Sequence, residues 1–198
     1  MLSFFLAVVS VTFAVEKRSY SFDALFVEGC SCKSVCVAEI TGADTGCHGL
    51  GAIQFYKGRY GDVNISDTRA AWAFTPEKTV VLYVDAPEKK RTAVSAFMTA
   101  ALADWGKLEV VKMAAIKITG TSGSYAAIIG NGSTGKLEVK ADTKGTTGVK
   151  LTNLKSLFHN ELFHDQTVHG AYADAKHHFD LKQTNAYYYP HCVMRGTI

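Results

Sequence analysis

Only one segment of this 198-residue chain combines the apolar repeat of a long helix with signals for both helix ends. In residues 85–106 the apolar side chains recur every three or four positions, as on a helix with one face against a core. Asp85 and Glu88 are spaced as a capping pair at its start, and Gly106 is a residue type that ends helices. Because one helix leaves little chain for parallel crossovers, the sequence predicts a largely antiparallel sheet.

Most of the remaining chain has the pattern of short strands divided by turns rich in Gly, Ser, Thr and Asn. Residues 21–29 form the first predicted strand, and residues 53–65 predict a hairpin that turns at Lys57 and Gly58. Together with the helix, these strands predict the α+β class. The expected fold is a largely antiparallel β-sheet with one long amphipathic helix packed on it.

The first 14 residues have the pattern of a secretory signal peptide. An apolar run from Leu2 to Phe13 is too short to span a bilayer and is followed by the small residue Ala14. We expect cleavage after Ala14, which leaves residues 15–198 as a single domain in a secreted or periplasmic protein without a membrane span. A retained anchor or a hydrophobic first strand is the alternative interpretation.

Composition and charge exclude several function classes. Hydrophobic residues make up 47% of the chain and charged residues 20%, as in ordinary globular proteins rather than disordered ones. The net charge is +3 and the basic residues are scattered, whereas a nucleic-acid groove needs a clustered basic face. Common hydrolase and phosphate-loop motifs do not occur. The sequence therefore favours a protein that is not an enzyme, with a thiol oxidoreductase acting through Cys30 or Cys32 as a weaker alternative, and it predicts no catalytic residue, nucleic-acid partner or particular protein partner.

Four of the five cysteines lie between Cys30 and Cys47. If the first strand extends that far, the sulfurs of Cys30 and Cys32 share one face, with α-carbons roughly 6.5 to 7 Å apart, the outer limit for a disulfide. Cys36 is close enough in sequence to turn back over this pair, and Cys47 and His48 follow a loop rich in Gly, Thr and Asp. Thiolates and imidazole suit Cu(I) or Zn(II). These five residues are the predicted metal ligands, and copper or zinc is the predicted cofactor.

Several short motifs also carry a resemblance to a known family. They are Glu28-Gly29-Cys30-Ser31-Cys32, Cys36, Thr45-Gly46-Cys47, Ile53, Gly58-Arg59-Tyr60-Gly61-Asp62-Val63, Leu82-Tyr83-Val84-Asp85 and Asn185-Ala186. On these residues the chain resembles the bacterial family catalogued as domain of unknown function 1326. The resemblance implies a site at the N-terminal cysteines and no particular activity. In that family the third cysteine typically begins Cys-Pro-Cys, whereas this chain has Cys36-Val37-Ala38 and so lacks one sulfur.

His191 and Cys192 could supply a further ligand, and Cys192 could instead form a disulfide with the cysteine window. An odd number of cysteines leaves at least one thiol outside any set of intrachain disulfides. The other histidines have spacings that predict surface positions. The favoured function is an exported copper- or zinc-binding protein for sequestration or delivery. The alternative is a disulfide-stapled structural or interaction module without metal.

Overall fold

The computed structural model describes residues 17–33, 36, 46–121, 124–140, 149–154 and 156–198. The strands are β1 (Ser19–Cys30), β2 (Gly49–Tyr60), β3 (Val63–Asn64), β4 (Thr68–Phe74), β5 (Thr79–Asp85), β6 (Lys107–Met113), β7 (Ile116–Thr121), β8 (Ser124–Ile129), β9 (Gly135–Lys140), β10 (Lys150–Thr152), β11 (Glu161–Ala173), β12 (His178–Leu181) and β13 (Thr184–Thr197), and the helix is α2 (Glu88–Ala101). The predicted signal peptide lies outside the described residues, so its cleavage after Ala14 stays a prediction.

All thirteen strands belong to one sheet. Its main path runs β6-β5-β4-β2-β1-β13-β11-β9-β8-β7, while β10 and β12 pair with β11, and β3 pairs with β2. Every pair is antiparallel except β5 and β6, which are parallel and joined through α2. The expected antiparallel pairing therefore dominates, but the sheet is mixed.

The prediction of an α+β fold with a long helix is wrong. The described chain is mostly β-structure, with a 13-stranded sheet and one helix of only 14 residues. The predicted start fails because Asp85 belongs to β5, where its carboxylate accepts a hydrogen bond from the Ile116 backbone, 3.0 Å away. Pro87 occupies the N-cap position, and the C-cap is Leu102 rather than Gly106. The predicted apolar face itself is present and buried.

The predicted turn at Lys57 and Gly58 is also wrong. β2 continues through both residues to Tyr60, and the chain turns at Gly61, whose φ is +55°. A Cβ atom at Gly58 would press against Ile65, so this glycine allows close packing within a strand rather than a reversal.

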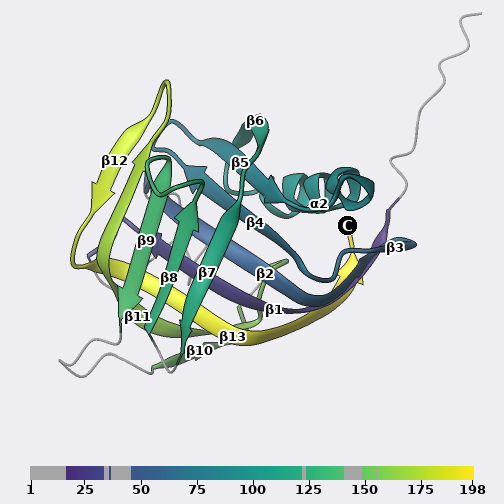
Figure 1. Ribbon diagram of the computed structural model, residues 1–198. Coiled ribbons are helices and arrows are strands. Elements are labelled where there is room, and N and C mark those ends of the chain that lie inside the picture. Colours follow the sequence, from purple (N-terminus) through teal and green to yellow (C-terminus); the bar gives the residue numbers. More distant parts are fainter. Residues whose placement is uncertain (1–16, 34–35, 37–45, 122–123, 141–148, 155) are drawn as a thin grey trace, which may run out of the picture.

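Two apolar cores lie on opposite faces of the long strands. The helix-side core joins buried residues of α2 to one face of the sheet and includes Phe26, Phe55, Trp72, Leu82, Val94, Phe97, Met98 and Phe158. The hairpin-side core joins the other face to β7, β8 and β9, and includes Val27, Leu50, Ala71, Val81, Ile118, Tyr125, Ile129 and Leu137. Figure 1 shows β7, β8 and β9 crossing the long strands β1, β2 and β4. The sheet thus curls so that its last strands cover its own centre.

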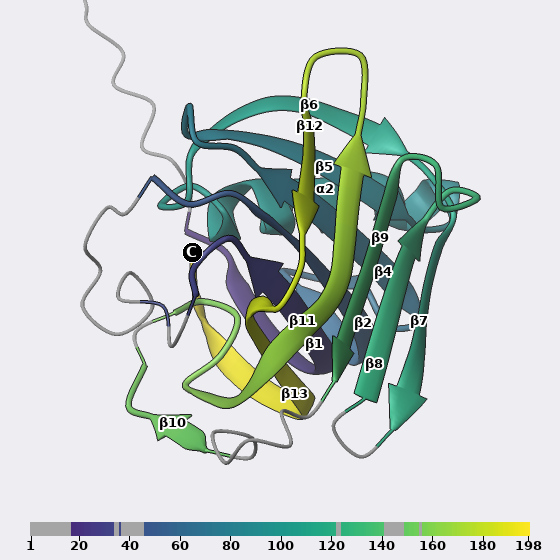
Figure 2. The same ribbon diagram turned by 90° about the vertical axis from the view of Figure 1, so that its left-hand side faces the viewer.

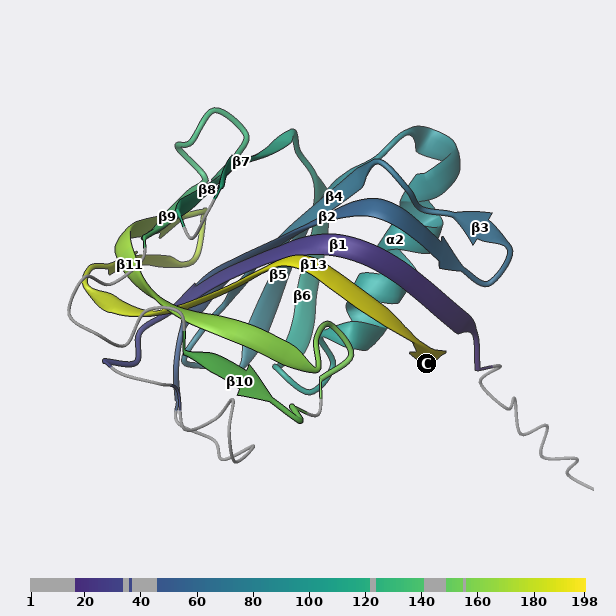
Figure 3. The same ribbon diagram turned by 90° about the horizontal axis from the view of Figure 1, so that it is seen from below.

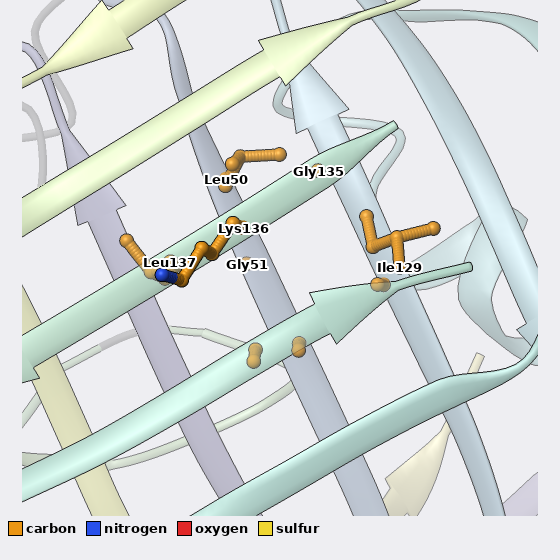
Figure 4. Close-up of a pocket in the computed structure, with 9 residues that line it drawn as sticks. Leu50, Gly51, Ile129, Gly135, Lys136 and Leu137 are labelled. Carbon is orange, nitrogen blue, oxygen red and sulfur yellow. The ribbon is translucent and has the colours of Figure 1, made fainter. Parts of the chain in front are cut away.

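The hairpin-side core is closely packed. Leu50 and Gly51 of β2 lie opposite Ile129 of β8 and Leu137 of β9 around a cavity of about 10 Å³ (Figure 4). Such a space holds about one water molecule, whereas small-molecule sites occupy roughly 300 Å³ or more. This cavity is therefore too small for such a ligand, and the residues around it contribute packing to the fold.

Strand register brings the predicted site together at one end of the three central strands. Cys30, the last residue of β1, pairs with Gly49, the first residue of β2. On the other side of β1, Gly29 pairs with Ala186 near the start of β13. Figure 2 views the molecule from the side on which β11 and β12 lie over these strands, and Figure 3 shows the far end of β13 continuing beside β1. Cysteines and residues more than 150 positions away thus meet at one sheet end.

Candidate metal centre

Four sulfur atoms converge where β1 ends and β2 begins. The sulfurs of Cys30, Cys32 and Cys36 all lie within 4.8 Å of one another, which makes them a group that could hold a metal ion. The sulfur of Cys47 lies 3.2 Å from that of Cys32 and 3.9 Å from that of Cys36. Cys32 and Cys36 are separated by 3.2 Å between sulfurs. The structure therefore brings together all four cysteines of the predicted window.

These spacings are compatible with a shared metal ion. Four sulfurs at about 2.3 Å from a tetrahedral Zn²⁺ are separated by about 3.8 Å from one another. The contacts of 3.2, 3.2 and 3.9 Å among Cys32, Cys36 and Cys47 bracket this value, and Cys30 lies within 4.8 Å of Cys32 and Cys36. The donor set consists of sulfur alone, which suits Cu(I) and Zn(II) and disfavours Mg²⁺ or Ca²⁺.

Burial divides the four cysteines into two pairs. Cys30 and Cys36 are buried in the helix-side core, whereas Cys32 and Cys47 are partly exposed at its edge. Hydrogen bonding with Cys36, together with burial, raises the pKa of the Cys30 thiol, and burial raises that of Cys32 to about 12. Without metal, Cys30 and Cys32 are therefore protonated at neutral pH, so a bound metal must displace protons from them.

Residues from β13 make hydrogen bonds to this cluster. The Asn185 side-chain amide donates to the Cys30 sulfur over 3.4 Å, and its backbone N–H donates to the Cys32 carbonyl over 2.7 Å. The Tyr187 hydroxyl accepts a bond from the Cys36 backbone N–H over 2.9 Å. Sequence reasoning assigned no site role to Asn185 or Tyr187, since only the pairing of β1 with β13 places them here.

His48 does not join the four sulfurs. Its ring packs against Phe179, with ring centroids 4.9 Å apart, on the hairpin side of the sheet, while Cys47 contacts the helix-side core. Consecutive residues of an extended chain point to opposite faces, which explains the separation. The backbone of His48 still supports the site, because its carbonyl accepts a hydrogen bond from the Ser31 N–H over 2.8 Å.

The structure also keeps His191 and Cys192 apart from the cluster. Cys192 pairs with Ala24, six residues before Cys30 along β1, a separation of roughly 20 Å. Its sulfur donates to the Phe158 carbonyl within the helix-side core. His191 is exposed and lies 3.2 Å from an Asp23 carboxylate oxygen. Neither residue is placed to complete the four-sulfur group or to form a disulfide with it.

Two histidines expected at the surface are buried. His159 is 0% exposed and its ring lies against Phe26, and His164 is 5% exposed. The imidazole Nε2 of His164 lies 2.8 Å from the Asn185 side-chain oxygen, which makes it the donor in that bond. The prediction of surface positions is thus wrong for both, because their spacing of five residues carries no information about the loop and strand that enclose them.

None of the five cysteines forms a disulfide in the structure. No helix of the described chain is long and apolar enough to cross a membrane. Comparison with known proteins found no matching family model and no matching curated protein. Among solved structures, the chain is similar to acetoacetate decarboxylase from Legionella pneumophila, with a TM-score of 0.42 and 9% identity over 90% of this chain and 86% of that one. An acetoacetate decarboxylase-like enzyme from Sphingomonas wittichii RW1 gives a TM-score of 0.36 and 10% identity over 92% and 94%. Likenesses this low carry no argument about function.

Proposed function

We propose that this chain is an exported protein that binds Cu(I) or Zn(II) through Cys30, Cys32, Cys36 and Cys47 and sequesters or delivers that ion. The observation that carries the proposal is the convergence of four cysteine sulfurs that form no disulfide, from two buried and two partly exposed residues, at one sheet end. The resemblance to domain of unknown function 1326 and the signal-like N-terminus belong to the same proposal.

The number of sulfurs favours binding over catalysis. Four thiolates fill a tetrahedral shell, whereas catalytic zinc sites keep a position open for water or substrate. The partly exposed sulfurs of Cys32 and Cys47 give an incoming ion or an accepting thiol a route to the buried pair. A site in which four thiolates surround the ion, two of them from partly exposed residues, suits a protein that holds a metal ion and then transfers it to an acceptor.

Metal titration of the reduced protein under anaerobic conditions tests the proposal. We expect Co²⁺, used as a probe for zinc, to give an intense sulfur-to-cobalt charge-transfer band, and Zn²⁺ to displace it. Cys32→Ser and Cys47→Ser should weaken binding at least tenfold. Cys192→Ser is the matched control, because it removes a buried thiol about 20 Å away from the cluster and should bind normally.

Counting thiols separates this proposal from the disulfide-stapled module. Metal-loaded protein that yields four or five reactive thiols after chelation and unfolding supports the metal site. A single thiol and no bound metal in freshly purified protein contradicts it and supports the module. Affinity should also fall on acidification, because protons compete with the ion for the thiolates.

Export is tested separately from metal binding. Expression of the complete chain in a bacterial host, followed by fractionation, should give a periplasmic or secreted form that begins at Val15. Intact mass measurement checks the cleavage position. A full-length chain that stays in the cytoplasm would contradict the export part alone and leave the metal site to the titration.

A further inference from the structure

We infer that Asn185 is a positioning residue of the metal centre, whose side-chain amide holds the Cys30 sulfur in place as a ligand and hydrogen-bonds to its thiolate. This inference rests on the proposed function. It goes beyond that function by assigning a role in the site to a residue that binds no metal itself and lies 155 positions from the cysteine it contacts.

Asn185 makes four hydrogen bonds that fix it between the cysteines and β11. Its Nδ2 donates to Cys30 Sγ over 3.4 Å, and its backbone N–H donates to the Cys32 carbonyl over 2.7 Å. Its Oδ1 accepts from His164 Nε2 over 2.8 Å, and its backbone carbonyl accepts from Thr167 Oγ1 over 3.1 Å. One residue thus contacts two members of the cysteine cluster and is itself held from the opposite side.

The orientation of the amide follows from its neighbours. The amide oxygen of Asn185 faces His164 Nε2, 2.8 Å away, and its NH₂ group faces the Cys30 sulfur, 3.4 Å away, so the two neighbours contact opposite ends of the amide. His164 and Asn185 are both buried, at 5% and 2% exposed. Both also sit on paired strands, where the sheet limits their movement. The donor is therefore preorganised before any ion arrives.

The local charge explains why such a donor is useful. A loaded site gathers several thiolates, and Glu28, buried at 5% exposure, lies two residues before Cys30 on the same face of β1. A neutral N–H donor stabilises a crowded thiolate by a charge-assisted hydrogen bond without introducing a competing cation. Groups that orient metal ligands in this way commonly change metal affinity by 10- to 100-fold.

Cadmium-113 NMR of the unmodified chain tests the contact directly. In protein loaded with ¹¹³Cd²⁺ and labelled with ¹⁵N, we expect a scalar coupling between the metal and an Asn185 side-chain N–H proton, transmitted through the N–H···S bond. This measurement needs no substitution, so it does not depend on the folding of a variant. Four-sulfur cadmium binding without this coupling would overturn the inference while leaving the proposed function intact.

The Asn185→Asp variant tests the consequence for binding. Aspartate keeps the size and the oxygen that accepts from His164, but it replaces the donor to Cys30 with a carboxylate oxygen. We expect Co²⁺ affinity to fall 10- to 100-fold and the sulfur-to-cobalt band to shift to lower energy, because a thiolate without its donor is easier to oxidise. A purely structural role would lower thermal stability and leave the band position unchanged.

Asn64→Asp is the matched control. The exposed side chain of Asn64 accepts only a local hydrogen bond from the Ser66 backbone, and Asn64 pairs with Arg59 near the far end of β2, roughly 33 Å from Gly49. It should bind Co²⁺ like the unmodified chain. An unchanged affinity and band in Asn185→Asp would overturn the inference alone. An unmodified chain that binds neither Co²⁺ nor Cd²⁺ would overturn the proposed function, and the inference with it.

Discussion

The sulfur atoms of Cys32 and Cys47 lie 3.2 Å apart, although the two residues are 15 positions apart in the chain. The closure depends on strand register: Cys30 pairs with Gly49, and the Ser31 N–H continues the ladder to the His48 carbonyl over 2.8 Å. The antiparallel pairing of β1 with β2 therefore fixes both ends of the cysteine loop. The sulfur cluster is a consequence of the sheet rather than of the loop alone.

This proximity predicts that oxidation competes with metal binding. Treating the metal-free protein with oxidised glutathione should convert two thiols into one disulfide that contains Cys32, since its sulfur lies 3.2 Å from those of both Cys36 and Cys47. The two thiols lose two protons and two electrons, and the oxidant becomes two molecules of reduced glutathione. The thiol count should fall from five to three, as thiol titration and peptide mapping can check.

The metal-loaded protein provides the control for this oxidation. Thiolates bound to Zn²⁺ should react more slowly, and the slow reaction should release the ion as the disulfide forms. A bridge that includes Cys192 would contradict the structure, because Cys192 lies roughly 20 Å from the cluster.

The cysteines of the candidate site were predictable from the sequence, but the other residues that do or do not contact them were not. The spacing of Cys30, Cys32, Cys36 and Cys47 placed four sulfurs near one strand end, and the structure confirms that they converge. Adjacency in sequence wrongly suggested His48 as well, because alternation along the chain turns its ring to the other face. The contribution of β13 depends on pairing across the whole chain, which local patterns do not encode.

The fold shows the same division between local and long-range information. The apolar stripe over Val94, Phe97 and Met98 was visible in the sequence, and α2 buries it. The helix ends were not predictable, because Asp85 is held by Ile116 of a strand that lies 31 positions later. The extent of the sheet was not predictable either, because β7, β8 and β9 are stabilised by packing over the centre of the same sheet.

A buried tyrosine pair predicts a measurable loss of stability. The hydroxyl oxygens of Tyr83 and Tyr172 lie 3.0 Å apart, and Tyr172 donates to the Asp174 carboxylate over 2.7 Å. Tyr172→Phe removes both hydrogen bonds of a hydroxyl at a position 2% exposed and leaves the buried Tyr83 hydroxyl without this partner, so the free energy of unfolding should fall by about 1–3 kcal/mol. Urea denaturation measures this. Tyr189→Phe, which removes a bond to Glu161 at a partly exposed position, should cost less, and an equal loss would contradict the assigned role of burial.

The buried imidazole of His159 predicts a pH dependence of stability. Burial lowers its pKa to about 3, whereas in the unfolded chain it is about 6.5. The unfolded state therefore binds a proton that the folded state does not bind between these values. The contribution of His159 to the free energy of unfolding is therefore fully present above about pH 6.5. It falls by up to about 1.4 kcal/mol for each pH unit as the pH drops toward 3.

His159→Gln should flatten this dependence between pH 7 and pH 4, whatever its effect on stability at neutral pH. The matched control is His169→Gln, since His169 is exposed, and it should leave the slope as in the unmodified chain. Denaturation curves over this range supply the slopes. An identical slope in His159→Gln would show that the imidazole does not control this part of the acid response.

The close approach of β2 to an indole ring predicts that Gly51 cannot be replaced without cost. A Cβ atom at Gly51 would overlap the ring of Trp72, which is fully buried and stacks on Phe158 with ring centroids 5.3 Å apart. Gly51→Ala must displace this stack, so we expect the free energy of unfolding to fall by about 1–3 kcal/mol. Trp72→Phe in the same chain provides space, so the double variant should lose less than the sum of the single losses. A purely additive result in urea denaturation would show that contact with the indole is not the reason for glycine at this position.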